Sequence, residues 1–304
     1  MKLSRWPIIG TAGLLLAGCS DFSEEADLEP EELRFKIVQL NKVAFSAEAK
    51  VLSIGSSAGD RFSSGAELIR LLLSRGDASY LEVGDVCRAK LGNSREDAFQ
   101  VENVWPDDDG LRERLELANL KLRRSVERRG AGNVALEIDS ILPEFAVIDQ
   151  DGEVIEASFF DGKTTLVSFF FTRCSNPAKC PAATQRFKLM LEKASEAGIS
   201  NLQVLSLSFD PEHDVPGVLK DYAQAYQLDE SRHRLGTGSK QVLDDLRQRI
   251  GISTRKDPAL IIDHTFRVVA VDGHRRVAAE ILGPLWSIEN TLARIRLVVQ
   301  EEDK

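Results

Sequence analysis

The chain has 304 residues, of which 43% are hydrophobic and 29% charged, a composition typical of globular proteins. This length allows about two domains of ordinary size. The formal net charge of −9 argues against nucleic acid as the main partner, because nucleic-acid-binding surfaces are basic.

The first 18 residues are predicted to be a targeting segment. Lys2 and Arg5 precede an apolar stretch that is too short for an ordinary transmembrane helix and ends in Leu-Ala-Gly-Cys at Cys19. The segment is similar to a bacterial lipoprotein signal peptide (residues 1–18), and this resemblance implies that Cys19 is lipidated. The alternative is an uncleaved N-terminal anchor. In both cases we expect a membrane-tethered protein on the periplasmic side of a bacterial membrane, and Ser20 favours the outer membrane.

Residues 19–33 are acidic and lack apolar periodicity, which predicts a tether. Residues 34–106 are predicted to form a small β-rich domain, because several stretches alternate like strands, with a short helix at Gly65–Ser74. This region contains no histidine and no methionine. A copper or zinc site is therefore not expected there, and a role as spacer or partner contact is favoured.

Residues 107–133 are predicted to form a connector helix. Leucines recur there at helical spacing, acidic residues open the stretch and arginines close it. The arginines complement the negative end of the helix dipole, which explains them better than binding to anionic lipid.

Residues 136–304 alternate strand and helix patterns, which predicts an α/β domain. The expected strands are 145–149, 164–171 and 201–209, the expected helices are 181–197, 215–226, 239–250 and 286–299, and a hairpin is expected at 259–271. A cysteine pair between the first long strand and the following helix favours a thioredoxin-like fold.

Cys174 and Cys180 follow an apolar strand and are separated by five residues. Pro181 is typical of a first helical residue, which puts Cys180 at or next to the N-cap. Free backbone N–H groups and the helix dipole would stabilise a thiolate there. This arrangement favours a redox pair or a soft-metal site over two structural cysteines. In an oxidising compartment the pair is the obvious disulfide, and Cys87, in an apparent strand, is expected to be a buried small hydrophobe.

His264 ends an apolar strand in a region that returns beside the cysteine loop in thioredoxin-like topology. A neutral imidazole there could join two thiolates in a three-coordinate site that suits Cu(I). Asp263 could orient the ring. Taken alone, His264 is better explained as an exposed turn histidine than as a ligand. A zinc site of the same residues is chemically possible.

Three motifs resemble the Sco/SenC family over about residues 140–300. They are Phe171-Thr-Arg-Cys174 with Cys180-Pro181, the run Asp-Pro-x-x-Asp-x-Pro-x-x-Leu-x-x-Tyr from Asp210 to Tyr222, and Asp263-His264-Thr265. The second motif is the most specific, because nothing in a generic thioredoxin requires it.

The resemblance implies a membrane-tethered copper chaperone with a thioredoxin-like fold. It implies Cys174, Cys180 and His264 as ligands for Cu(I) or Cu(II), and Asp210 and Asp214 as residues that support the site or dock a partner. It further implies a part in assembling the CuA centre of cytochrome c oxidase, by copper delivery or by thiol reduction. The expected partners are the copper subunit of the oxidase or its assembly factors, and a thiol reductant protein.

The chain departs from the family pattern in one respect, because three residues usually separate the cysteines. The longer loop changes the geometry for copper more than it affects thiol exchange. The main alternative is thus a periplasmic thiol–disulfide oxidoreductase without a copper role, and His264 distinguishes the two. A peroxiredoxin-like peroxidase fits less well, since Thr172 lies two places before Cys174 rather than three. A Sco-like binding module without activity is the fourth hypothesis.

Overall fold

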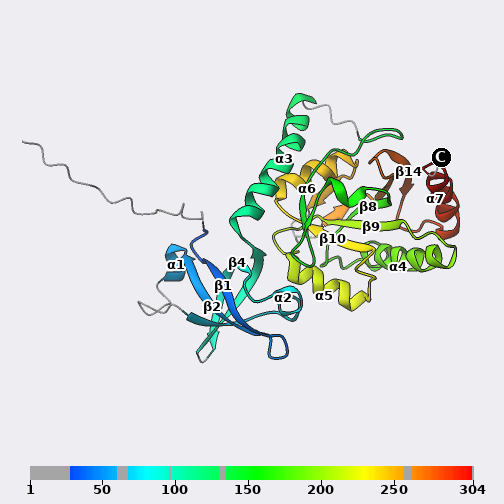
Figure 1. Cartoon of the computed structure of the whole chain (residues 1–304). Helices are drawn as coiled ribbons and strands as arrows, with labels where there is room; N and C mark the ends of the chain where they lie inside the picture. The colour runs from blue at the N-terminus through cyan, green and yellow to red at the C-terminus, as the bar shows by residue number, and fades with distance from the viewer. Residues whose placement is uncertain (1–27, 60–67, 96, 130–134, 257–261, 303–304) are drawn as a thin grey trace, which may run out of the picture.

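The structure is a computed structural model that describes residues 28–59, 68–95, 97–129, 135–256 and 262–302 (Figure 1). The predicted signal peptide, Cys19 and most of the predicted tether lie outside these ranges. The predicted tether is too long at its C-terminal end, since the first strand already begins at Glu32. Of the helices in the described ranges, none has both the length and the hydrophobicity needed to cross a membrane.

The N-terminal part is a closed five-stranded barrel. Its elements are β1 (Glu32–Asn41), β2 (Ser46–Ile54), α1 (Ser56–Gly59), β3 (Leu68–Leu72), α2 (Arg75–Tyr80), β4 (Val86–Arg95) and β5 (Ala98–Pro106). The strand order is β1-β2-β3-β5-β4, and the barrel closes where β4 pairs with β1. Leu33, Phe35 and Ile37 alternate along β1 and point into the barrel core.

The helix predicted at Gly65–Ser74 is wrong, because Leu68–Leu72 is strand β3. Ile69 and Leu71 are buried and their neighbours are more exposed, so the segment follows a period of two. The strand pairs with β2 and runs parallel to β5. By composition, a short apolar run fits a helix or a strand equally well. Here the pairing with β2 and β5 determines that the segment is a strand.

Helix α3 (Asp109–Arg129) connects the barrel to the α/β part, as predicted (Figure 1). Leu122 is fully buried in the α/β core. The Asn119 side chain accepts from the backbone N–H of Ala146 and donates to its carbonyl. These contacts fix the helix against the segment that leads into the sheet.

The C-terminal part is an α/β sandwich. Its elements are β6 (Val147–Asp149), β7 (Val154–Ile155), the 3-10 helix η1 (Ala157–Phe160), β8 (Thr164–Phe170), α4 (Cys180–Glu196), β9 (Leu202–Ser208), α5 (Pro216–Tyr226), β10 (His233–Thr237), α6 (Lys240–Arg249), β11 (Thr254–Lys256), β12 (Ile262–His264), β13 (Arg267–Val271), β14 (Val277–Leu282) and α7 (Ile288–Glu302). The seven-stranded sheet has the order β14-β13-β8-β9-β10-β6-β7, and β8, β9 and β10 are parallel.

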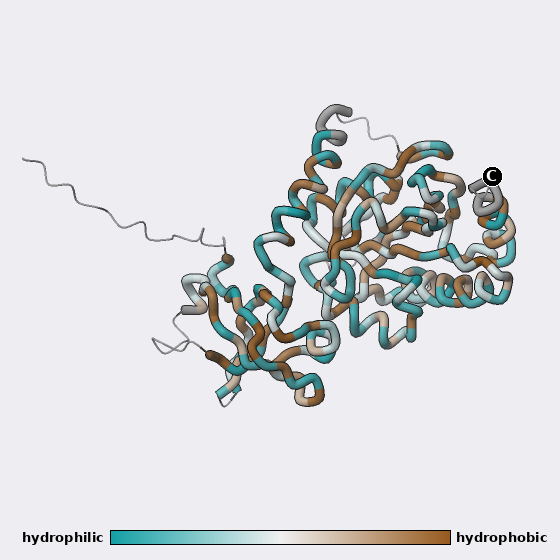
Figure 2. The backbone as a smooth tube through the Cα atoms, in the orientation of Figure 1, coloured by the Kyte–Doolittle hydropathy of each residue, from teal (hydrophilic) through white to brown (hydrophobic). Residues whose placement is uncertain are grey.

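Helices cover both faces of this sheet. Apolar side chains of α4 and α7 pack with Leu166 and Val204 on one face, where α5 also packs against Phe170. On the other face, α6 and α3 pack with Val167 and Leu205. Every residue of β8 and β9 is therefore buried, as expected for central parallel strands. In Figure 2, stretches of apolar colour lie along the central strands of this part.

The hairpin predicted at 259–271 is wrong. Strand β12 pairs with β11, whereas β13 pairs with β14 and with β8. Strands β12 and β13 thus belong to different sheets, and His264 ends the first of them. Strand β10 was not predicted, because its sequence His-Arg-Leu-Gly-Thr has no apolar alternation, and its parallel pairing with β9 determines its conformation.

Candidate metal and thiol site

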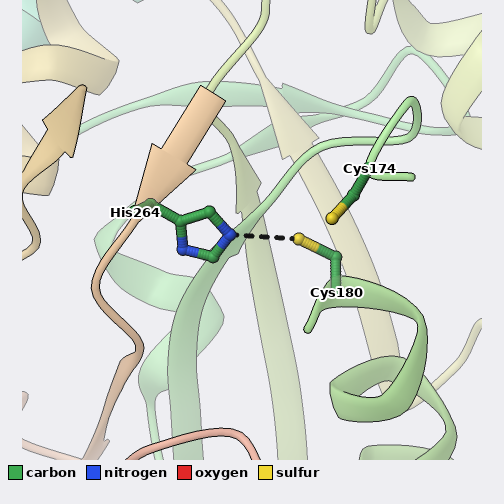
Figure 3. Close-up of side chains that lie close together, drawn as sticks. All are labelled: Cys174, Cys180 and His264. Carbon is green, nitrogen blue, oxygen red and sulfur yellow. Dashed lines mark hydrogen bonds between the residues drawn. The ribbon is translucent and has the colours of Figure 1, made fainter. Parts of the chain in front are cut away.

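The structure brings Cys174, Cys180 and His264 together, although the histidine lies 84 positions after Cys180. One ligand atom from each residue lies within 4.8 Å of the other two. Sγ of Cys180 is 3.4 Å from Nε2 of His264. Figure 3 shows the three side chains pointing at one another from a loop, from the start of helix α4 and from the end of β12. Their role as metal ligands stays a prediction, but their predicted proximity is present in the fold.

The five residues between the cysteines do not separate the thiols, because they form a compact turn. The side-chain oxygen of Asn176 accepts a hydrogen bond from the backbone N–H of Ala178. The backbone carbonyl of Asn176 accepts one from the backbone N–H of Lys179. The chain therefore turns back and delivers Cys180 beside Cys174. Nζ of Lys179 lies 3.5 Å from the carbonyl oxygen of His264, which ties this turn to β12.

Helix α4 begins one residue earlier than predicted. Lys179 is the N-cap, Cys180 is the first helical residue and Pro181 is the second. The Cys180 side chain is 1% exposed and packs with Phe170, Phe171 and the apolar side of α5. The second thiol is therefore an interior group, whereas Cys174 is partly exposed.

The expectation that Cys180 is the stabilised thiolate is wrong. A hydrogen bond with Cys174, burial and the negative charge of Cys174 raise the pKa of Cys180 far above its usual range. The Cys180 thiol donates to the Cys174 sulfur, and this bond, supported by His264, holds the pKa of Cys174 well below that of an ordinary thiol. The backbone N–H groups of Phe171 and of Cys180 itself oppose the shift at Cys180 but are the smaller effect. The thiolate belongs on Cys174, because the more exposed sulfur bears the charge at lower cost.

The imidazole of His264 is held in one tautomer by the backbone. Its Nδ1 lies 3.0 Å from the carbonyl oxygen of Thr265. A carbonyl only accepts, so Nδ1 carries a proton and Nε2 is the ring nitrogen that faces Cys180. The ring is 6% exposed and packs against Phe209, with ring centroids 4.7 Å apart. An imidazole held in this way has Nε2 arranged as a ligand atom.

The predicted orienting residue Asp263 pairs through its backbone with Arg255, and its side chain lies outside the described part of the structure. The backbone carbonyl of Thr265 occupies the orienting position instead. Sequence reasoning missed this contact because a carbonyl oxygen carries no residue-specific signal.

Asp214 supports the cysteine loop without facing the three ligand atoms. It is fully buried and accepts from the Thr172 hydroxyl at 2.5 Å, from the Thr172 backbone N–H at 3.2 Å and from the Ser208 hydroxyl at 2.6 Å. Burial raises the pKa of Asp214, and the bonds from Ser208 and Thr172 oppose this shift. Its carboxyl group thus fixes the backbone two residues before Cys174.

Asp210 supports the same loop through Arg173. The two side chains form an ion pair in which Nε of Arg173 lies 3.1 Å from Oδ2 of Asp210. The positive charge that the sequence places beside the thiols is therefore used to fix the loop. Asp210 and Asp214 thus hold the two residues directly before Cys174, and their role in supporting a metal site or docking a partner stays a prediction.

Cys87, Cys174 and Cys180 are free thiols, so the structure describes the reduced pair. The disulfide between Cys174 and Cys180 stays a prediction. Cys87 is fully buried in the barrel, which confirms that it is a small core hydrophobe, and burial raises its pKa.

Comparison with known proteins gives a match over the C-terminal part of the chain. The sequence model of the SCO1/SenC family matches residues 135–300. An SCO2-like protein of Rickettsia conorii is 26% identical over 160 residues, which cover 50% of this chain and 75% of that protein. A SCO1 protein homolog of Bacillus subtilis is 31% identical over 97 residues, which cover 32% of this chain and 49% of the homolog.

Two solved structures are similar to the α/β part. A SCO1/SenC family lipoprotein from Bacillus anthracis has a TM-score of 0.49 and 23% identity, and the match covers 54% of this chain and 99% of that protein. Copper-bound ScoI from Arabidopsis thaliana has a TM-score of 0.46 and 20% identity, with coverage of 54% and 99%.

Proposed function

Because the chain belongs to the SCO1/SenC family, we propose that it is a copper carrier of the Sco type that assists the assembly of a copper centre in a partner protein. Sco proteins are cytochrome c oxidase assembly proteins, and the CuA-bearing subunit of that oxidase is the proposed client. The observation that carries the proposal is the grouping of two cysteine sulfurs and one imidazole nitrogen within 4.8 Å.

The donor set fits copper better than it fits the other common metals. Thiolates and a neutral imidazole are soft ligands, and three of them suit Cu(I). A structural zinc site takes four ligands, and among the described residues no further histidine, cysteine or carboxylate joins this group. Magnesium and calcium require oxygen ligands. Copper bound here would be held by Cys174, Cys180 and His264.

The residues around the three ligands have separate tasks in this proposal. Cys174 is charged and partly exposed, so it meets the incoming metal or the client first. Cys180 would release its proton to solvent on metal binding, because only the thiolate is a metal ligand. His264 would offer Nε2 to the metal, because its Nδ1 already faces the carbonyl oxygen of Thr265. Asp210 and Asp214 keep Cys174 in place through Arg173 and Thr172.

We place the protein on the periplasmic side of a bacterial membrane, attached through a lipid on Cys19. The support is the sequence of residues 1–19, which combines two basic residues, a short apolar stretch and Leu-Ala-Gly-Cys. Fractionation of cells that express the wild type and Cys19→Ser tests this proposal. Wild type in the membrane fraction and the variant outside it would support the anchor, and equal distribution would refute it.

A second candidate is thiol–disulfide exchange, favoured by the contrast between a partly exposed thiolate and a buried thiol. The Cys174 thiolate attacks a disulfide of the client. Cys174 then forms a mixed disulfide with one client sulfur, and the other client sulfur leaves as a thiolate. Cys180 then loses its proton and attacks Cys174 Sγ, which releases the second client thiol and leaves the Cys174–Cys180 disulfide. A thiol reductant protein must supply two electrons, and one proton must be taken up, to restore the Cys174 thiolate and the Cys180 thiol.

An anaerobic Cu(I) titration of the reduced mature chain separates the two candidates. One tight equivalent in the wild type, lost in Cys174→Ser and Cys180→Ser and weakened in His264→Ala, supports the copper carrier. His274→Ala is the matched control, because His274 is exposed and lies outside the ligand group. No tight binding, together with a Cys174–Cys180 pair that still cycles, would refute copper carriage and favour the oxidoreductase.

A further inference from the structure

The barrel contacts the α/β part at the start of helix α5, where two glycines let the backbones approach closely (Figure 1). A Cβ atom on Gly76 of α2 would lie 1.8 Å from the carbonyl oxygen of Gly217. A Cβ atom on Gly217 would lie 2.0 Å from Oδ1 of Asp77. No side chain fits at either position, so helix α2 and the first turn of α5 are fixed against each other.

Polar contacts flank this glycine contact on both sides. Nε of Arg75 lies 3.0 Å from Oδ1 of Asp221, one turn further along α5. On the other side, Nδ2 of Asn103 in β5 donates to the carbonyl oxygen of Glu212 at 3.4 Å. Barrel residues therefore contact the chain at residue 212 and again at residues 217 and 221.

The turn that contains Glu212, the first of these contacts, also holds the cysteine loop. Residues 210–214 form a tight turn in which the backbone N–H groups of His213 and Asp214 donate to the carbonyl of Asp210. The side chains of Asp210 and Asp214 bond to Arg173 and Thr172, directly before Cys174. Glu212, which the barrel contacts, is thus in the middle of the turn that positions Cys174.

We propose that the N-terminal barrel is a positioning element of the Cys174–Cys180–His264 site. Helix α2 and Asn103 hold residues 210–217, and this segment holds Thr172 and Arg173. The proposal deepens the proposed function, since it states what sets the geometry of the same site. Loss of the barrel contact lets the turn move, and Cys174 then loses part of the arrangement that binding requires. The barrel acts in this way although it contributes no ligand.

Two variants test the contact from different sides. Gly217→Ala places a methyl group against Asp77 and forces α2 away from α5. Asn103→Gly removes the hydrogen bond to Glu212, and glycine accepts the positive φ of 54° found at this position. Gly110→Ala in α3 is the matched control, because its new Cβ would meet only the side chain of Asp108, at 3.3 Å.

Each variant is measured in the full mature chain in two ways. Cu(I) affinity is obtained by competition with a chromophoric chelator, and the Cys174–Cys180 dithiol–disulfide equilibrium is measured in glutathione buffers. Couplings between sites in proteins correspond to about 2- to 30-fold in an equilibrium constant. For Gly217→Ala and Asn103→Gly we expect the Cu(I) dissociation constant and the dithiol–disulfide equilibrium constant each to change by a factor in this range. For Gly110→Ala we expect no change in either constant.

Thermal unfolding distinguishes a positioning role from a merely structural one. Variants with a lower unfolding temperature but wild-type affinity and redox equilibrium would overturn the proposal. If Gly217→Ala does not fold, Asn103→Gly decides by the same two measurements. A wild type that binds no copper would refute the proposed function, whereas the dithiol–disulfide equilibrium would still test the positioning role.

Discussion

In the reduced, metal-free chain, the alkylation rate of Cys174 should be nearly constant between about pH 6 and about pH 8. The hydrogen bond from Cys180 holds the pKa of Cys174 below this range, so the sulfur is already a thiolate throughout it. An ordinary thiol, with a pKa of about 8.5, gains roughly tenfold in thiolate for each pH unit over most of this range. The flat profile is thus the signature of the shifted pKa.

Replacing Cys180 by alanine removes the donor that stabilises this thiolate. A hydrogen bond to a charged group contributes about 1.5–3 kcal/mol, and one pH unit corresponds to about 1.4 kcal/mol. The pKa of Cys174 should therefore rise by about one to two pH units, with the lower end expected because the sulfur is partly exposed. The inflection of the alkylation profile moves upward by the same amount.

Labelling with iodoacetamide, followed by mass spectrometry of the Cys174 peptide, measures this profile from about pH 4 to about pH 9. Cys180→Ser is the matched control, because a hydroxyl group still donates and should keep the profile close to that of the wild type. A wild-type rate that rises tenfold per pH unit up to about pH 8 would refute the reasoning. So would identical profiles for the alanine and serine variants.

Three further predictions concern stability. Burial raises the pKa of Asp77 from 3.8 to about 6. Its contribution to the free energy of unfolding is therefore complete below about pH 4 and is lost as pH rises through about 6. Asp77→Asn should remove about 3 kcal/mol of this pH dependence in urea unfolding. Burial lowers the pKa of His233 to about 3. Its contribution to the free energy of unfolding is therefore present above about pH 6.5 and is lost as pH falls towards about 3. His233→Gln should therefore shift the acid-unfolding midpoint to lower pH, and an unchanged midpoint would contradict this. Leu205→Ala, at a fully buried position, should cost about 2–5 kcal/mol in chemical denaturation. Leu285→Ala, at a position 70% exposed, should cost less than about 0.5 kcal/mol.

The grouping of Cys174, Cys180 and His264 could be predicted from the sequence because its signals are local. An apolar strand, two cysteines and a proline mark the loop and the start of helix α4. The topology of the resembled family then brings the later strand with His264 to the same edge. An association of Asp210 and Asp214 with this site was likewise implied by the resemblance of their motif to the family.

Which of the two cysteines carries the thiolate could not be predicted, because the answer depends on how deeply each sulfur is buried and not on its sequence neighbours. Both cysteines lie near positive residues, and the helix start favours Cys180. The fold buries Cys180 behind Cys174, and that burial decides which sulfur carries the charge.

The pairing of short strands could not be predicted either. Leu68–Leu72 and Ile262–His264 are too short to show a reliable period, and distant partners determine their conformation. The glycine contact of Gly76 with Gly217 gives no signal at all, since glycine in a sequence indicates a turn at least as often as a close approach.

The burial of Cys87 has a consequence for the order in which the chain folds. All strands of the barrel precede residue 107, so the barrel can form before Cys174 and Cys180 have emerged from the ribosome or translocon. Cys87 is then already enclosed in the apolar core of the barrel when Cys174 and Cys180 emerge. Among the three cysteines of the described residues, Cys174 is then left with Cys180 as its partner in an oxidising environment, and mispairing with Cys87 is avoided before His264 is synthesised.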